Sequence, residues 1–163
     1  MHIIIKNKHL IYGNYKIRCA IGKKGVGKKK KEGDFITPLG SYRITKVFFR
    51  KDRVKNLRTK IKKLEINKKM GWCDDPRSNN YNKLIKYPFI YSSEKLYRRD
   101  NIYDIIVVLN YNINPIIKNR GSAIFIHITK KNYKKTKGCV AIKKRDMKKL
   151  LKMISMKTKI TII

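Results

Sequence analysis

Apolar residues in this 163-residue chain mostly occur in short runs separated by turn-forming residues, and this pattern most limits its possible folds. Residues 104–112 and 122–130 are rich in Ile, Val and Phe, as strands are, and residues 41–49 and 158–163 are similar. Gly13-Asn14 predicts a hairpin turn, and Pro38 with Gly40 predicts another turn. The pattern therefore predicts a mostly β fold.

Only one segment has a clear helical period. Met147, Leu150, Leu151 and Ile154 follow the spacing i, i+3, i+4, i+7, which predicts an amphipathic helix of about three turns. Residues 50–69 are basic without strand alternation, so we expect a surface loop or a short helix there. Residues 70–89 are rich in turn formers and predict a long irregular loop, a kind of segment that often binds ligands or acts as a lid.

The chain shows no internal repeat and no linker, and its length is that of one domain. We therefore expect residues 1–163 to form a single, mostly β domain with one or two short helices. The N-terminal apolar run has only three residues, too short for the core of a signal peptide. No stretch approaches the roughly 18 apolar residues of a spanning helix, so no membrane span is expected.

The formal net charge of +33 normally indicates a polyanionic partner such as nucleic acid. However, the chain also contains 33 Lys, 26 Ile and 13 Asn, the trio that an AT-rich coding bias produces. The lysines lie in clusters along the whole chain instead of in one tail. We expect attraction to an anionic polymer and do not expect nucleic acid as the dedicated partner. A basic nucleic-acid-binding β domain without catalysis is kept as the alternative.

The chain has three cysteines, an odd number, and no Cys-x-x-Cys pair, which argues against a disulfide framework and a metal site. No cofactor is expected. Alternation over residues 122–130 places His127 opposite Ile126 and Ile128, away from the predicted apolar core. His127 stands twelve residues before Cys139. A buried thiol and a satisfied imidazole, or a nucleophile and its base, are the two interpretations of this pair.

Three stretches together resemble the YkuD-like L,D-transpeptidase catalytic domain, in a compact single-domain bacterial branch. His127 is followed by Thr-Lys-Gly-Cys-Val at 136–140, preceded by Gly-Asp-Phe-Ile-Thr-Pro-Leu-Gly at 33–40 and by the 70–82 segment. The resemblance spans about residues 15–155 and implies a β-sandwich-like fold with a helix after the cysteine. Lys137 stands where many members have a second histidine, and Ala141 stands where many have arginine.

The resemblance implies that Cys139 is the nucleophile and His127 the proton donor and acceptor. We expect a neighbouring imidazolium to lower the pKa of the thiol. Gly138 and Cys139 would offer backbone N–H groups to the oxyanion, and Thr136 or a carbonyl near the histidine would orient the imidazole. The candidate substrate contacts are Lys137, Arg120, Trp72 and Tyr81.

The implied substrates are peptidoglycan stem peptides or muropeptides. A tetrapeptide stem would acylate the cysteine and release D-Ala, and an amine of a second stem would accept the acyl group. If water accepts it, the product is that of an L,D-carboxypeptidase. The resemblance implies the cell envelope or periplasm, whereas the missing signal peptide leaves the cytoplasm as the alternative. A monomer is favoured.

Overall fold

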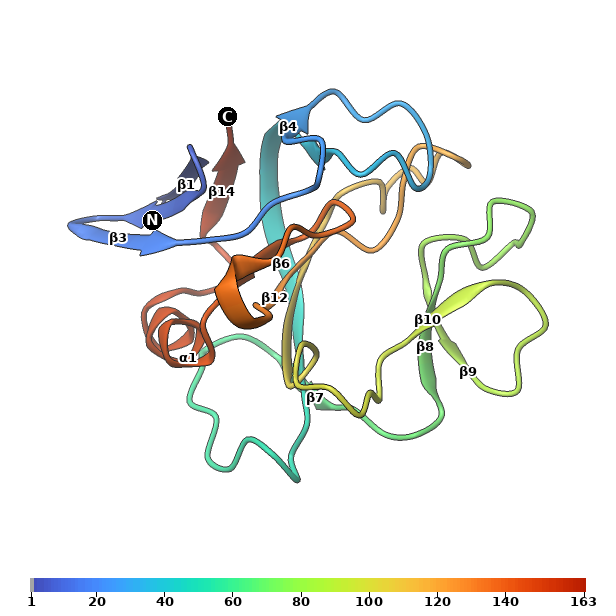
Figure 1. Cartoon of the computed structure of the whole chain (residues 1–163). Helices are drawn as coiled ribbons and strands as arrows, with labels where there is room; N and C mark the ends of the chain where they lie inside the picture. Colours follow the sequence, from blue (N-terminus) through green and yellow to red (C-terminus); the bar gives the residue numbers. More distant parts are fainter. Residues whose placement is uncertain (1) are drawn as a thin grey trace.

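The computed structural model describes residues 2–163, which fold around one large curled sheet (Figure 1). The strands before the site are β1 (His2–Lys6), β2 (His9–Tyr12), β3 (Tyr15–Arg18), β4 (Val26–Gly27), β5 (Thr37–Pro38), β6 (Gly40–Phe49) and β7 (Lys63–Glu65). Those that follow are β8 (Met70–Cys73), β9 (Leu84–Lys86), β10 (Ser93–Lys95), β11 (Ile105–Leu109), β12 (Phe125–Ile128), β13 (Val140–Ile142) and β14 (Lys159–Ile162). The helices are the 3₁₀ turn η1 (Lys131–Tyr133) and α1 (Lys144–Met153).

The large sheet runs in the order β13-β12-β11-β6-β14-β1-β2-β3, with β7 paired to β6 off this path. The two ends of the chain meet in it, because β1 pairs with β14 in parallel. A second sheet of three strands, in the order β10-β8-β9, lies on the other side of the large sheet from α1 (Figure 1). We call this second sheet the small sheet.

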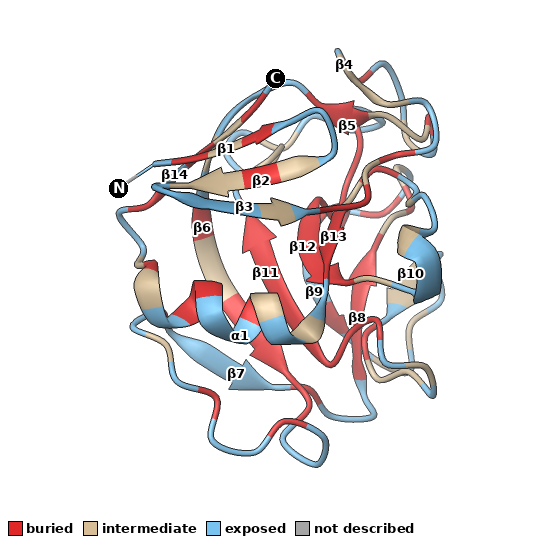
Figure 2. Cartoon of the chain, turned by 60° about the vertical axis from the view of Figure 1, so that its left-hand side comes forward, coloured by how far each residue is buried: buried red, intermediate tan, exposed pale blue. Residues whose placement is uncertain are grey.

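Two apolar clusters fill the two sides of the large sheet. In the first, the buried side of α1 packs against one face of the sheet (Figure 2). This cluster includes Ile124, Ile126, Ile128, Met147, Leu150, Leu151 and Ile154. The second cluster joins the opposite face to the small sheet and includes Phe48, Trp72, Leu96, Tyr103 and Phe125. The alternation predicted for β12 is therefore present, with isoleucines toward the helix and Phe125 toward the small sheet.

The mostly β fold and the amphipathic helix after the cysteine are confirmed. Gly13 and Asn14 connect β2 to β3, and Gly13 adopts the positive φ of +52° that such a turn needs. The helix considered for residues 50–69 does not form: turns and β7 occupy that segment.

The prediction of one irregular loop at residues 70–89 is wrong at both ends of the segment. Met70–Cys73 and Leu84–Lys86 are antiparallel strands of the small sheet, and all of β8 is buried. The turn-forming residues that suggested a loop are concentrated between these strands, at residues 74–83. Four residues of β8 are too few to show a period, so the burial of this strand comes from packing against the second apolar cluster.

The simple alternation expected along residues 41–49 is also interrupted. The register of β6 against β11 shifts, because Val108 pairs with Lys46 and Leu109 pairs with Ile44. One extra residue on β6 therefore opposes the partner strand, as in a β-bulge. As a result Ile44 and Val47 both join the first apolar cluster although they are three positions apart.

Within residues 2–163, no helix has both the length and the apolar character needed to cross a membrane.

Candidate active site

Cys139 and His127 lie on the same face of two adjacent parallel strands. The register pairs Ile126 with Val140 and His127 with Ala141. Cys139 directly precedes β13 and lies beside Phe125, whose N–H points to the sulfur at 3.4 Å. Side chains two residues apart on a strand share a face, and diagonal neighbours on paired strands lie within reach of each other. The thiol and the imidazole therefore face the small sheet together, away from α1.

A short turn, held by its own hydrogen bonds, presents the cysteine. The Thr136 hydroxyl donates to the Cys139 carbonyl oxygen at 2.6 Å and accepts from the Gly138 N–H at 3.1 Å. Gly138 has φ +142°, and a Cβ there would stand 2.9 Å from the Ile36 carbonyl oxygen. Only glycine fits this backbone and this close approach. Thr136 thus shapes the turn and makes no hydrogen bond to the imidazole.

The Cys139 thiol is partly buried and already engaged. It donates to the Ala123 carbonyl oxygen at 3.0 Å, and among residues 2–163 it makes no hydrogen bond to His127. Burial, followed by the negative charge of Glu94, raises the pKa of the Cys139 thiol to about 12. The resting sulfur is therefore a protonated thiol near neutral pH.

The His127 imidazole is 7% exposed and is held from two sides. Its Nδ1 lies 2.9 Å from the Ile128 carbonyl oxygen, and the Tyr103 ring meets it edge to face at 5.4 Å between centroids. A carbonyl oxygen can only accept, so Nδ1 carries the proton and Nε2 keeps its lone pair. Burial lowers the pKa of His127 to about 4, so the ring is neutral near pH 7.

These two pKa shifts correct the expectation of a thiolate beside an imidazolium. Burial disfavours the charged form of each group, and the two side chains share a face without a hydrogen bond between them. The resting pair is a thiol and a neutral imidazole. The orienting group is the Ile128 carbonyl, which is the second of the two alternatives that the sequence left open.

Two residues that the sequence did not single out complete the surroundings of the pair. Tyr103 is 3% exposed and packs on His127, and its hydroxyl donates a hydrogen bond to the Glu94 carboxylate. Glu94 lies on β10 opposite Trp72 and is partly buried. Burial, the largest effect, raises the pKa of Glu94. Glu94 is one of ten acidic residues in the chain, and only the fold shows what it faces.

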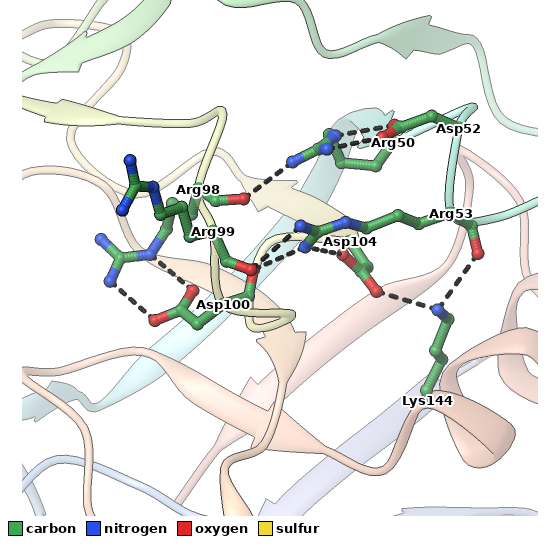
Figure 3. A network of polar contacts seen from close by, with 8 residues as sticks. All are labelled: Arg50, Asp52, Arg53, Arg98, Arg99, Asp100, Asp104 and Lys144. Atoms are coloured by element: carbon green, nitrogen blue, oxygen red, sulfur yellow. Dashed lines mark hydrogen bonds and ion pairs between the residues drawn. The ribbon is translucent and has the colours of Figure 1, made fainter.

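A polar network fixes the segment that carries Tyr103 (Figure 3). Asp104, the next residue, is buried and accepts from Arg53 at 3.2 Å and from Lys144 at 2.8 Å. Arg98 pairs with Asp100 through two hydrogen bonds of 2.8 Å. Lys144 is the first residue of α1, so the network ties the helix to the entry of β11 and holds Tyr103 in place.

The four predicted substrate contacts have different surroundings. Trp72 is 4% exposed, donates its indole N–H to Asn82 and meets the Phe125 ring at 5.2 Å. Tyr81 is 1% exposed, donates to Glu32 at 2.5 Å and accepts from the Gly121 N–H.

Neither of those two rings is free to line an open groove, because packing and hydrogen bonds already surround them. Arg120 and Lys137 are exposed and form no ion pair with another described residue. Lys137 stands two residues before Cys139, and its charge acts on Glu94.

Among residues 2–163, no group of three or more His, Cys, Asp or Glu side chains is arranged to hold a metal ion. Cys19 and Cys73 are buried and free, and burial raises the pKa of Cys19 to about 12.

No curated protein matches the chain. The family model of the L,D-transpeptidase catalytic domain, YkuD, matches residues 2–162, which include β12, the cysteine turn, the small sheet and α1. The chain therefore belongs to the L,D-transpeptidase catalytic domain family.

Proposed function

We propose that this protein is a peptidoglycan L,D-transpeptidase in which Cys139 is the nucleophile and His127 transfers protons. The observation that carries the proposal is the pairing of β12 with β13, which places a thiol and a basic imidazole nitrogen on one face. Membership of the family implies a peptidoglycan substrate. The family resemblance implies which bond of the donor is broken, namely the amide bond between a diamino acid of the stem and D-Ala.

The first half-reaction forms an acyl-enzyme. The Cys139 sulfur attacks the carbonyl carbon of the donor bond while Nε2 of His127 takes the thiol proton. The carbon–nitrogen bond then breaks, and the imidazolium returns that proton to the amine of the departing D-Ala. Because the resting pair is neutral, ionisation of the sulfur accompanies attack and does not precede it.

The second half-reaction transfers the acyl group. An amine of a second stem peptide attacks the thioester carbon, and a carbon–nitrogen bond forms as the carbon–sulfur bond breaks. The amine proton passes through His127 to the departing sulfur, which regenerates the thiol. Water in place of the amine gives a carboxylic acid, which is the L,D-carboxypeptidase outcome.

Backbone hydrogen bonds narrow the choice of oxyanion donor. The Gly138 N–H already donates to Thr136, whereas the Cys139 N–H has no hydrogen-bond partner among residues 2–163. We assign the oxyanion contact to the Cys139 N–H, and such a donor typically lowers the barrier by about 3 kcal/mol. Gly138 contributes by letting the substrate carbonyl approach the turn.

The exposed cations at this end of the molecule suit an anionic substrate. We assign Lys137, two residues before Cys139, to a substrate carboxylate near the thiol, and Arg120, which is also exposed, to a second substrate carboxylate. The burial of Trp72 and Tyr81 favours a supporting role for both rings, behind the residues that touch substrate. A peptidoglycan substrate places the working enzyme in the cell envelope.

Replacement of the nucleophile tests the proposal. We expect Cys139→Ser to fold normally and to form no acyl-enzyme, since a hydroxyl ionises far less readily than a thiol. Intact mass after incubation with a stem tetrapeptide or a carbapenem measures the adduct. Cys73→Ser, a buried thiol on β8, is the matched control and should still acylate. Equal acylation of the Cys139→Ser variant would show that the nucleophile is another residue.

A further inference from the structure

Glu94 is an acidic side chain without an ion pair in a chain that has 43 Lys and Arg. Among residues 2–163, seven of the ten carboxylates have a cation within 4.0 Å: Asp34, Asp52, Glu65, Asp75, Asp100, Asp104 and Asp146. The three others are Glu32, Asp74 and Glu94. With four cations for every acid, an unpaired carboxylate in a partly buried position costs free energy unless something else balances it.

The small sheet brings Glu94 to the catalytic face. Glu94 pairs across strands with Trp72, whose ring packs on Phe125 of β12 at 5.2 Å. Its carboxylate accepts from Tyr103, whose ring lies against both Phe125 and His127. Its charge also acts on the Cys139 thiol. Of the other two unpaired acids, Asp74 accepts a hydrogen bond from Ser92, and Glu32 accepts one from Tyr81 and has a smaller effect than Glu94 on the Cys139 thiol.

The cations around Glu94 leave its carboxylate available. The Arg98 guanidinium donates two hydrogen bonds to Asp100. The charge of Lys137 acts on Glu94, but the Lys137 amine does not lie within 4.0 Å of the carboxylate. Glu94 is a partly exposed residue, whereas Trp72 opposite it is buried. A carboxylate without a cation within 4.0 Å suits a positively charged group.

We propose that Glu94 binds an ammonium group of the substrate beside Cys139 and thereby sets specificity for amine-bearing stem peptides. This inference rests on the proposed function and deepens it. The ammonium group has two possible sources. One is the acceptor amine, which binds as an ammonium group and releases one proton to solvent before its nitrogen attacks the acyl-enzyme. The other is a free amine on the donor stem. Both bind as cations, which would pair with the negative charge of the Glu94 carboxylate. The hydrogen bond from Tyr103 would keep the carboxylate oriented toward either group.

The acceptor arm of the test compares two nucleophiles on one acyl-enzyme. Glycinamide is a largely cationic amine near neutral pH, whereas hydroxylamine is mostly uncharged, and both attack the same thioester carbon. Mass spectrometry gives the ratio of amide to hydroxamate product from a stem tetrapeptide donor. We expect Glu94→Gln to lower this ratio about tenfold, equivalent to one ion pair at the site. We expect Tyr103→Phe to lower it less.

The donor arm compares a tetrapeptide that has a free side-chain amine with its N-acetylated form. If the donor supplies the ammonium group, wild type acylates faster with the free amine, and Glu94→Gln loses most of that preference. Glu65→Gln, an exposed acid on β7, removes the same charge far from the site and should change neither ratio. Thermal unfolding of each variant, with Glu94→Asp as a second substitution that keeps the charge, separates loss of binding from loss of fold.

The outcomes separate this inference from the proposed function. A lower ratio in either arm supports ammonium binding and identifies its source. Unchanged ratios in both arms, with normal acylation of Cys139, would overturn the role of Glu94 and leave the transpeptidase assignment intact. Failure of wild type to form any adduct at Cys139 would instead contradict the proposed function itself.

Discussion

The His127 side chain shows how burial and chemistry compete at a single residue. The ring is enclosed by Tyr103 and by the Ile128 carbonyl, and this enclosure fixes its orientation. The same enclosure lowers the pKa of the ring to about 4 and keeps it neutral. A neutral imidazole can accept the thiol proton during attack, so the residue is ready as a base although it cannot stabilise a resting thiolate.

A stability measurement tests the burial of His127. An unfolded histidine titrates near pH 6.5, whereas the folded ring titrates at about 4. Between these pH values the unfolded chain binds more protons, so stability falls as pH drops from about 6.5 to about 4. This effect should cost about 3 kcal/mol. We expect His127→Gln to remove that part of the decline in urea unfolding measured from pH 7 to pH 4.

The difference between wild type and variant isolates this one group, because the carboxylates that titrate in the same range are present in both. His2→Gln, at an exposed histidine on β1, is the matched substitution elsewhere in the chain. Parallel profiles for wild type and His127→Gln would mean that the imidazole is not buried in the neutral form.

At the scale of elements, Asn82 is the residue that joins the small sheet to the cysteine turn. Its side-chain oxygen accepts from the Trp72 indole at 2.9 Å and from the Ala123 N–H at 3.0 Å. Its side-chain nitrogen donates to the carbonyls of Tyr111 and Asn112. Ala123 has φ +52°, an unfavourable value for alanine, and its carbonyl oxygen accepts a hydrogen bond from the Cys139 thiol. Asn82 thus holds the backbone that orients the nucleophile.

Removal of this link should affect both fold and activity. Asn82→Ala leaves two buried N–H groups and two carbonyls without their partner, so we expect the free energy of unfolding to fall by about 3 kcal/mol. We also expect slower acylation of Cys139, because Ala123 loses the bond that maintains its conformation. Asn79→Ala, an exposed asparagine of the same 74–83 segment, should change stability by less than about 0.5 kcal/mol. Denaturant unfolding and intact-mass acylation rates report the two effects, and equal behaviour of both variants would refute the link.

The elements that the sequence predicted well are those with a local signal. The helix at residues 144–153 has a clear period, and β11 and β12 are continuous or alternating apolar runs. The family resemblance singled out His127 and Cys139 as candidate catalytic residues, and alternation predicted the face on which His127 lies. The small sheet was missed because β8, β9 and β10 have only three or four residues each and pair over long separations. Glu94 and Tyr103 were missed for the same reason, since no local pattern brings β10 and the start of β11 to His127.

At the scale of the whole molecule, positive charge covers more than one surface. A hollow of about 310 Å³ between the 56–58 turn and α1 is lined by five cations and no acid: Arg58, Arg145, Lys148, Lys149 and Lys152. A second hollow of about 170 Å³, near Cys19 on another part of the chain, is also lined by several cations. The nucleic-acid alternative would need free stacking aromatics among these cations. Tyr81 is buried, and the ring of Tyr133, which lines the second hollow, is already stacked with Arg18 at 4.7 Å. This distribution favours general attraction to an anionic polymer over one built site.

The last prediction follows from that distribution. Retention of the Cys139→Ser variant on isolated sacculi should weaken steeply between about 0.05 and 0.5 M NaCl, because salt screens exposed charges. A triple change of Lys148, Lys149 and Lys152 to Glu alters the α1 hollow, whereas the same change at Lys6, Lys16 and Lys159 alters β1, β3 and β14, which do not line it. All six lysines are exposed, and both triples remove the same positive charge. If attraction depends on total charge, both triples should weaken retention equally, as a co-sedimentation series would show. Loss confined to the α1 triple would instead identify the hollow as a dedicated anion site and contradict the diffuse interpretation.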